Sequence, residues 1–138
     1  MRTKRTILGL VAVALLAASA AFAQEDEPYV QTQNVVYDEV DGVGLIMDIF
    51  VPRGEKNGLG VVDVVSGAWH SDRGKINDHK KAGMYDVFCG RGYTVFGVRP
   101  GSVNRFTGEE MLRHLKTGIR WVKAHASEYG VDPERLAI

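Results

Sequence analysis

Cysteine, proline and excess charge are scarce in this sequence, and each scarcity removes a class of structure or partner. One of the 138 residues is cysteine and four are proline, while Lys and Arg balance Asp and Glu at 17 each. A single cysteine excludes a disulfide within these residues, even in an oxidising compartment. Because Cys89 lies at the end of an expected helix, we interpret it as a buried structural thiol and not as a nucleophile.

The first 23 residues have the pattern of a targeting segment. Three of the first five residues are Lys or Arg, and an apolar run, Ile7–Ala18, follows them. Ala21–Ala23 then places small residues where a signal peptidase reads the chain, so we predict cleavage before Gln24. An uncleaved membrane anchor is the alternative, but the run is short for a span and rich in Ala. The prediction is an exported bacterial protein, periplasmic or secreted, with no stable membrane insertion after cleavage.

Residues 24–138 form one domain with a modest core in this interpretation. They hold 14 Lys and Arg against 17 Asp and Glu, a formal net charge of −3, so we expect no nucleic-acid partner. Apolar patterns and turn signals predict strands over 30–37, 45–51, 60–65 and 93–98, helices over 78–91 and from Thr107 to Gly130, and a last strand from 136.

The alternation of strands and helices predicts an α/β fold with a largely parallel sheet covered on both faces. The first two strands are expected to pair as a hairpin through Asp41-Gly42. Thr107 and Glu110 form the pattern of a helix capping box. Asp63 is unexpected inside an apolar strand, so either one face of that strand is wetter or its carboxylate has a partner.

Four stretches carry a resemblance to a known family. They are Met47–Pro52, Val64–Trp69, Tyr93–Val98 and Ala124–Ile138. In this order and spacing they resemble the N-terminal half of α/β-hydrolases, specifically secreted bacterial esterases of the lipase and feruloyl-esterase-like branch. The resemblance implies a β-hairpin followed by parallel strands with covering helices. It also implies an incomplete domain, truncated before the strand-to-helix elbow that carries the nucleophile.

The resemblance assigns roles to residues after two of the strands. Val64–Trp69 matches the family's histidine-glycine-glycine-glycine-tryptophan type of motif, in which backbone N–H groups stabilise the oxyanion of the reacting ester. Gly67 and Ala68 would supply oxyanion contacts, and Trp69 would pack beneath the loop or line the acyl pocket. Ser66 and Ser102 are candidate substrate contacts.

The sequence departs from the family in three places. Val65 and Ser66 stand where the family has histidine and its first glycine, and His114 stands where related sequences often carry aspartate. The glycine-x-serine-x-glycine elbow is expected within a few residues after Ile138, so the nucleophile, the acid and the histidine of the triad are absent from these 138 residues.

The resulting functional hypothesis is an exported serine hydrolase that cleaves small-molecule carboxylic esters through an acyl-enzyme in the intact protein, without a cofactor. A peptidase of the prolyl-oligopeptidase type shares the fold and stays open as an alternative. A catalytically inactive fragment or binding module is the third possibility. If the polypeptide ended at Ile138, an uncovered sheet edge would leave it poorly folded.

The histidines do not predict a metal site. His114 and His125 lie 11 residues apart on one expected helix, which is ~16 Å of rise and too far to share an ion. His79, near the start of the first helix, is expected to be solvated. His70 and Asp72 lie beside the loop of the oxyanion motif and are candidates for contacting substrate, but we expect them to be exposed loop residues.

Arg99 and Arg105 flank the loop that follows the 93–98 strand. They are candidates for binding a substrate carboxylate. Surface charge is the alternative, and we favour it slightly.

Overall fold

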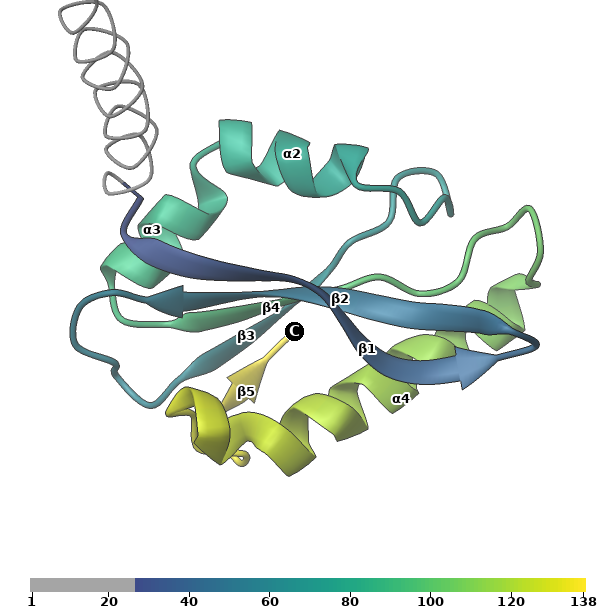
Figure 1. Ribbon diagram of the computed structural model, residues 1–138. Coiled ribbons are helices and arrows are strands. Elements are labelled where there is room, and N and C mark those ends of the chain that lie inside the picture. Colours follow the sequence, from purple (N-terminus) through teal and green to yellow (C-terminus); the bar gives the residue numbers. More distant parts are fainter. Residues whose placement is uncertain (1–26) are drawn as a thin grey trace, which may run out of the picture.

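The computed structural model describes residues 27–138, so the predicted signal peptide and its cleavage site lie outside the described part (Figure 1). Its five-stranded sheet has the order β1-β2-β4-β3-β5. The strands are β1 (Tyr29–Val40), β2 (Val43–Pro52), β3 (Gly60–Val64), β4 (Thr94–Val98) and β5 (Leu136–Ala137). The β1–β2 hairpin is confirmed, and β2 pairs antiparallel with β4. Only β3, β4 and β5 run parallel, so the sheet is mixed.

Helices cover both faces of the sheet, as predicted. In Figure 1, α2 (Gly74–Lys81) and α3 (Met84–Gly90) lie above the sheet, and α4 (Gly108–His125) with the 3-10 helix η1 (Ala126–Tyr129) lies below it. Two apolar clusters match this division. One contains Ile76, Tyr85 and Cys89 of the upper helices, and the other contains Val122 of α4. Because successive side chains of β2 point to opposite faces of the sheet, β2 contributes residues to both clusters.

A single helix over 78–91 was the wrong prediction, because the structure has two helices there. α2 begins earlier, at Gly74, and the chain turns at Gly83 with a φ of 70° before α3 starts. Glycine adopts this left-handed conformation without a Cβ penalty, so it can end one helix and redirect the chain. Cys89 is buried in α3, as expected, and burial raises the pKa of its thiol to about 12.

α4 follows the sequence prediction closely. Thr107 Oγ1 accepts the N–H of Glu110, and the Glu110 carboxylate accepts the N–H of Thr107, which completes the capping box. Gly130 ends the following 3-10 helix at a φ of 73°. The capping box at the start of this segment and the glycine at its end were therefore both correctly predicted from the sequence.

Asp63 has the partner that the sequence left unnamed. Its Oδ2 accepts a hydrogen bond of 2.9 Å from the Tyr85 hydroxyl, and His79 Nδ1 lies 2.8 Å from the same oxygen. Burial, followed by the Asp63 charge, raises the pKa of Tyr85 well above its ordinary value. The expectation that His79 is solvated was wrong, because α2 places its ring partly buried against β3.

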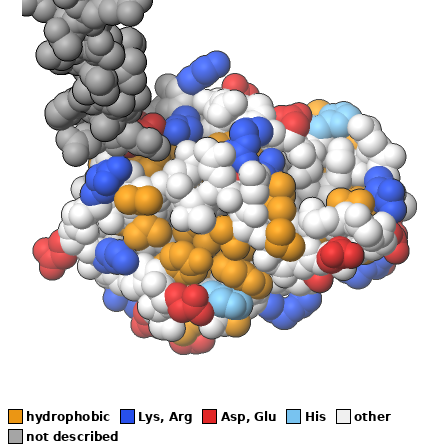
Figure 2. Space-filling view, in the orientation of Figure 1, with side chains coloured by type: hydrophobic (Ala, Val, Ile, Leu, Met, Phe, Trp, Pro, Cys, Tyr) orange, Lys and Arg blue, Asp and Glu red, His pale blue; other side chains and the backbone are white. Residues whose placement is uncertain are grey.

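Hydrophobic surface concentrates beside the short strand β5. Two hollows flank it, lined mainly by apolar residues of β3, β5 and α3. Figure 2 shows hydrophobic side chains gathered over the region where Figure 1 places β5, with charged side chains around them. Between residues 27 and 138, no helix has the length and apolar character needed to cross a membrane.

Candidate active site

Two loops meet at the edge of the sheet where the parallel strands β3 and β4 end. The loop 65–73 joins β3 to α2, and the loop 99–106 joins β4 to α4. The Val65 N–H donates to the Val98 carbonyl at 2.9 Å, and the Val103 N–H donates to the Trp69 carbonyl at 3.0 Å. Carboxyl ends of adjacent parallel strands are where open α/β sheets place their sites.

The loop after β3 contains a tight two-residue turn from Gly67 to His70. The Gly67 N–H donates to the His70 carbonyl at 3.2 Å, and the His70 N–H donates back to the Gly67 carbonyl at 2.8 Å. The two central residues, Ala68 and Trp69, have φ values of 49° and 66°. Positive φ at both central positions is the feature of a type I′ turn, which normally selects Asn or Gly.

This turn carries backbone strain next to N–H groups that have no acceptor among the described residues. A left-handed conformation costs a residue with a Cβ roughly 1–2 kcal/mol, and two such residues follow one another here. Among the described residues, the N–H groups of Ala68 and Trp69 have no acceptor, whereas the Gly67 N–H is used inside the turn. Ala68 is also an exposed residue. Strained backbone that presents free donors is typical of functional sites.

The other site residues predicted from the sequence lie around this turn. Trp69 is 58% exposed and projects from the turn, so the structure leaves its indole accessible. Ser102 precedes Val103, which bonds to the Trp69 carbonyl, and the Ser102 carbonyl accepts the N–H groups of Arg105 and Phe106. The hydroxyl of Ser66 is buried and has no hydrogen-bond partner among the described residues. A direct contact between Ser66 and a substrate would therefore require this hydroxyl to become exposed.

Arg99 is not a surface charge, which corrects the interpretation favoured from the sequence. Its side chain is 5% exposed, and Nη2 donates to Asn34 Oδ1 at 2.9 Å and approaches Asp48 Oδ1 at 3.5 Å. Burial lowers the pKa of Arg99, the charge of Arg73 acts in the same direction, and Asp48 opposes both. Arg105, by contrast, is exposed and donates to the carbonyl of Asp41.

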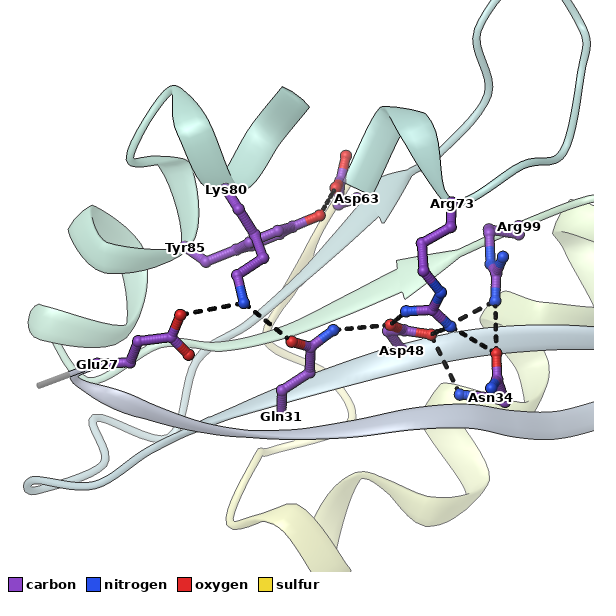
Figure 3. A network of polar contacts seen from close by, with 9 residues as sticks. All are labelled: Glu27, Gln31, Asn34, Asp48, Asp63, Arg73, Lys80, Tyr85 and Arg99. Atoms are coloured by element: carbon purple, nitrogen blue, oxygen red, sulfur yellow. Dashed lines mark hydrogen bonds and ion pairs between the residues drawn. The ribbon is translucent and has the colours of Figure 1, made fainter. Parts of the chain in front are cut away.

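Asp48 is the centre of a polar network that the sequence did not reveal (Figure 3). It is fully buried in the middle of β2. Arg73, at the end of the loop 65–73, donates from Nη1 to Asp48 Oδ2 at 2.6 Å and from Nη2 to Asn34 Oδ1 at 2.6 Å. The Asn34 N–H and Gln31 Nε2 also donate to the carboxylate, at 3.1 and 2.8 Å. A charged residue inside the apolar stretch Ile46–Val51 was the available signal.

His114 holds the second loop against α4. The Gly101 N–H donates to its Nδ1 at 3.3 Å, and the Phe106 ring packs edge-on against the imidazole. Burial lowers the pKa of His114, while the carboxylates of Glu110 and Asp38 act in the opposite direction. The bond from Gly101 requires an unprotonated Nδ1, so the folded state favours the neutral ring.

This environment predicts a loss of stability in mild acid. Below the ordinary histidine pKa of about 6.5, the unfolded chain binds a proton at His114 more readily than the folded chain. The free energy of unfolding should therefore fall as the pH drops from 7 to 5. In the full-length protein, His114→Gln should show a shallower fall in melting temperature over this range than wild type. His125→Gln, which removes a histidine stacked on Trp121, is the control. Equal slopes for wild type and His114→Gln would contradict the prediction.

The part of the chain that the structure describes contains no group of three or more His, Cys, Asp or Glu side chains able to hold a metal ion. His70 and Asp72 are both exposed, as expected from the sequence. The Asp72 carboxylate accepts the N–H of Gly74 at 2.7 Å and so helps to begin α2.

The chain is similar to one protein family and to several solved structures. A family model described as BD-FAE matches residues 47–138, which is two thirds of the chain. None of the curated proteins is similar enough in sequence to match. A thermophilic esterase from the planctomycete Thermogutta terrifontis is 28% identical, with a TM-score of 0.62, over 75% of this chain and 38% of that chain. The same esterase is known phosphoramylated by tabun.

More distant structures share the fold. Esterase B from Lactobacillus rhamnosis is 16% identical, with a TM-score of 0.61, over 92% of this chain and 41% of its own. A bifunctional GH43-CE protein from Bacteroides eggerthii is 22% identical, with a TM-score of 0.65, over 78% of this chain and 15% of its own. The chain thus spans about two fifths of the length of the two esterases that it matches.

Proposed function

Because the chain belongs to the BD-FAE family of α/β-hydrolase-type esterases, we propose that the full-length protein hydrolyses carboxylic esters through an acyl-enzyme. The observation that carries the proposal is the strained turn at Gly67–His70, which presents the free N–H of Ala68 at the carboxyl edge of the sheet. An N–H held in this way can stabilise the negative charge that develops on an ester carbonyl oxygen during attack.

The division of roles follows from the geometry of the turn. The Ala68 N–H is the oxyanion donor in this proposal. Gly67 keeps the turn closed through its two bonds to His70, which refines the role expected from the sequence. Trp69 and Ser102, from the two adjoining loops, line the approach of a small-molecule ester. Residues 1–138 contain no glycine-x-serine-x-glycine motif, so this proposal assigns no nucleophile, acid or histidine within them.

Reaction with tabun supports a nucleophilic mechanism in the Thermogutta terrifontis relative, since organophosphorus reagents modify activated hydroxyl nucleophiles. We extend that mechanism to the full-length protein. We also propose export, on the pattern of residues 1–23. A mature N-terminus at Gln24 in protein recovered from the periplasm or medium would support export, and an intact Met1 would contradict it.

Purified full-length protein should hydrolyse p-nitrophenyl acetate, with kcat on the order of 1–1000 per second. Diethyl p-nitrophenyl phosphate should abolish this activity by releasing p-nitrophenolate and adding one diethylphosphoryl group per chain, detectable by mass spectrometry. Cleavage of a dipeptidyl p-nitroanilide without ester hydrolysis would favour the peptidase alternative. No turnover of either substrate and no phosphorylation would contradict the proposal and favour a binding module.

A further inference from the structure

We propose that Arg73 is a positioning residue for the Gly67–His70 turn, acting through Asp48 and Asn34. The proposal rests on the function proposed above, because the turn that Arg73 would hold is the one presenting the oxyanion donor. We call Arg73, Asp48, Asn34 and Arg99 the clamp. Figure 3 shows the guanidinium groups of Arg73, at the end of the loop 65–73, and Arg99, just after β4, beside the Asp48 carboxylate of β2 and the Asn34 side chain of β1.

The loop 65–73 needs a fixed point at its far end. Its first residue is held by the bond from Val65 to Val98, and its middle is held by the bond from Val103 to Trp69. The second of these bonds reaches another loop, whose residue Val103 is itself 49% exposed. Two successive residues with positive φ persist only where the surroundings over-determine them. Besides the packing of Ile76 of α2, Arg73 restrains the far end, because it ties the last residue of the loop directly to the sheet.

The groups that Arg73 bonds to are held in place by the sheet. Asp48 is fully buried on β2 and accepts further bonds from Gln31 and from the Asn34 N–H. Asn34 sits at a register shift of β1 with a φ of 58°, and its Oδ1 accepts from both Arg73 and Arg99. The left-handed Asn34 lies in this β-bulge, and its side-chain oxygen is an acceptor shared by two guanidinium groups.

The shape of the guanidinium matters more than its charge. Arg73 uses Nη1 for Asp48 Oδ2 and Nη2 for both Asp48 Oδ1 and Asn34 Oδ1. A lysine ammonium carries the same charge but cannot present this planar pair of donors. Arg73→Lys should therefore keep the fold and the charge of the clamp while loosening the loop that it holds.

The decisive variant is Arg73→Lys in the full-length protein. For p-nitrophenyl acetate we expect kcat to fall on the order of tenfold to 100-fold, since a misplacement of about 1 Å has effects of this size. KM should stay within about threefold of wild type, because the oxyanion donor acts mainly in the transition state. Arg113→Lys is the matched control: Arg113 also pairs with a carboxylate at 2.6 Å, but on the exposed side of α4. It should leave both constants unchanged.

Hydrogen exchange gives a readout that does not depend on catalysis. The amides of Gly67 and His70 bond across the turn, and in Arg73→Lys they should exchange at least about fivefold faster than in wild type or Arg113→Lys. Asn34→Gly, which keeps the left-handed backbone and removes the shared acceptor, should have the same effect in smaller measure. Unchanged exchange in both variants would overturn the proposal.

The kinetic and hydrogen-exchange measurements together distinguish failure of the clamp from failure of the proposed function. If wild type does not hydrolyse the ester but exchange at Gly67 and His70 responds to Arg73→Lys, the function fails and the positioning role stands. If wild type is active and Arg73→Lys keeps kcat within about twofold with unchanged exchange, the function stands and the clamp fails.

Discussion

Replacing Asp48 by alanine is expected to lower the free energy of unfolding of the full-length protein by about 3–5 kcal/mol, the cost of breaking a buried ion pair from one side. Arg99 would keep its charge inside the protein with no carboxylate beside it. Arg73, which is about one third exposed, can turn toward water and contributes less to the loss. Urea denaturation at neutral pH measures the change.

Glu109→Ala is the matched control for this variant. Glu109 also accepts an arginine bond of 2.6 Å, from Arg113, but both side chains are largely exposed. Exposed pairs of this kind contribute roughly 0–1 kcal/mol, so the control should shift the denaturation midpoint little. An equal effect of Asp48→Ala and Glu109→Ala on the free energy of unfolding would contradict the prediction that burial makes the Asp48 ion pairs more important for stability.

Ala68→Pro is expected to reduce kcat for p-nitrophenyl acetate by a factor on the order of 100 to 1000, the effect of losing one oxyanion donor. Proline has no N–H and fixes φ near −65°, so it removes both the donor and the left-handed conformation of the turn. KM should change much less, because the donor is used mainly in the transition state.

Ala68→Gly keeps the N–H and adopts positive φ without strain. It should retain kcat within about threefold, and its free energy of unfolding should lie within about 1 kcal/mol of wild type, because relief of strain offsets added freedom of the unfolded chain. Full activity of Ala68→Pro would remove the Ala68 N–H from the mechanism. Inactivity of both variants would point to the methyl group of Ala68 in place of its N–H.

Periodicity and turn chemistry predicted most of the elements of this fold. The hairpin, the β4 strand and the capped helix α4 rest on local signals, namely Asp41-Gly42, an unbroken apolar run, and Thr107 with Glu110. The break between α2 and α3 was missed. Gly83 reads in sequence as a tolerated helix glycine, and only the packing of both helices on the sheet selects its left-handed conformation.

The site was predicted less well, because its main features depend on contacts distant in sequence. Asp48 and Arg99 are 51 residues apart, and the antiparallel pairing of β2 with β4 brings them together. Arg99 therefore looked like a surface charge until that register was known. Ala68-Trp69 carries none of the usual signals of a type I′ turn, so its strained conformation could be found only in the structure.

The bulge at Asn34 also affects how the molecule behaves among its own copies. β1 lies at the edge of the sheet, and the outer backbone of such a long strand offers a template for intermolecular pairing. The register shifts between Thr32 and Val35 and between Val36 and Asp38 break the regular ladder of β1. A bulged edge is a poor template for another strand. We therefore expect the bulge at Asn34, which bonds to two arginines and to Asp48, to disfavour pairing of β1 with another copy of the protein as well.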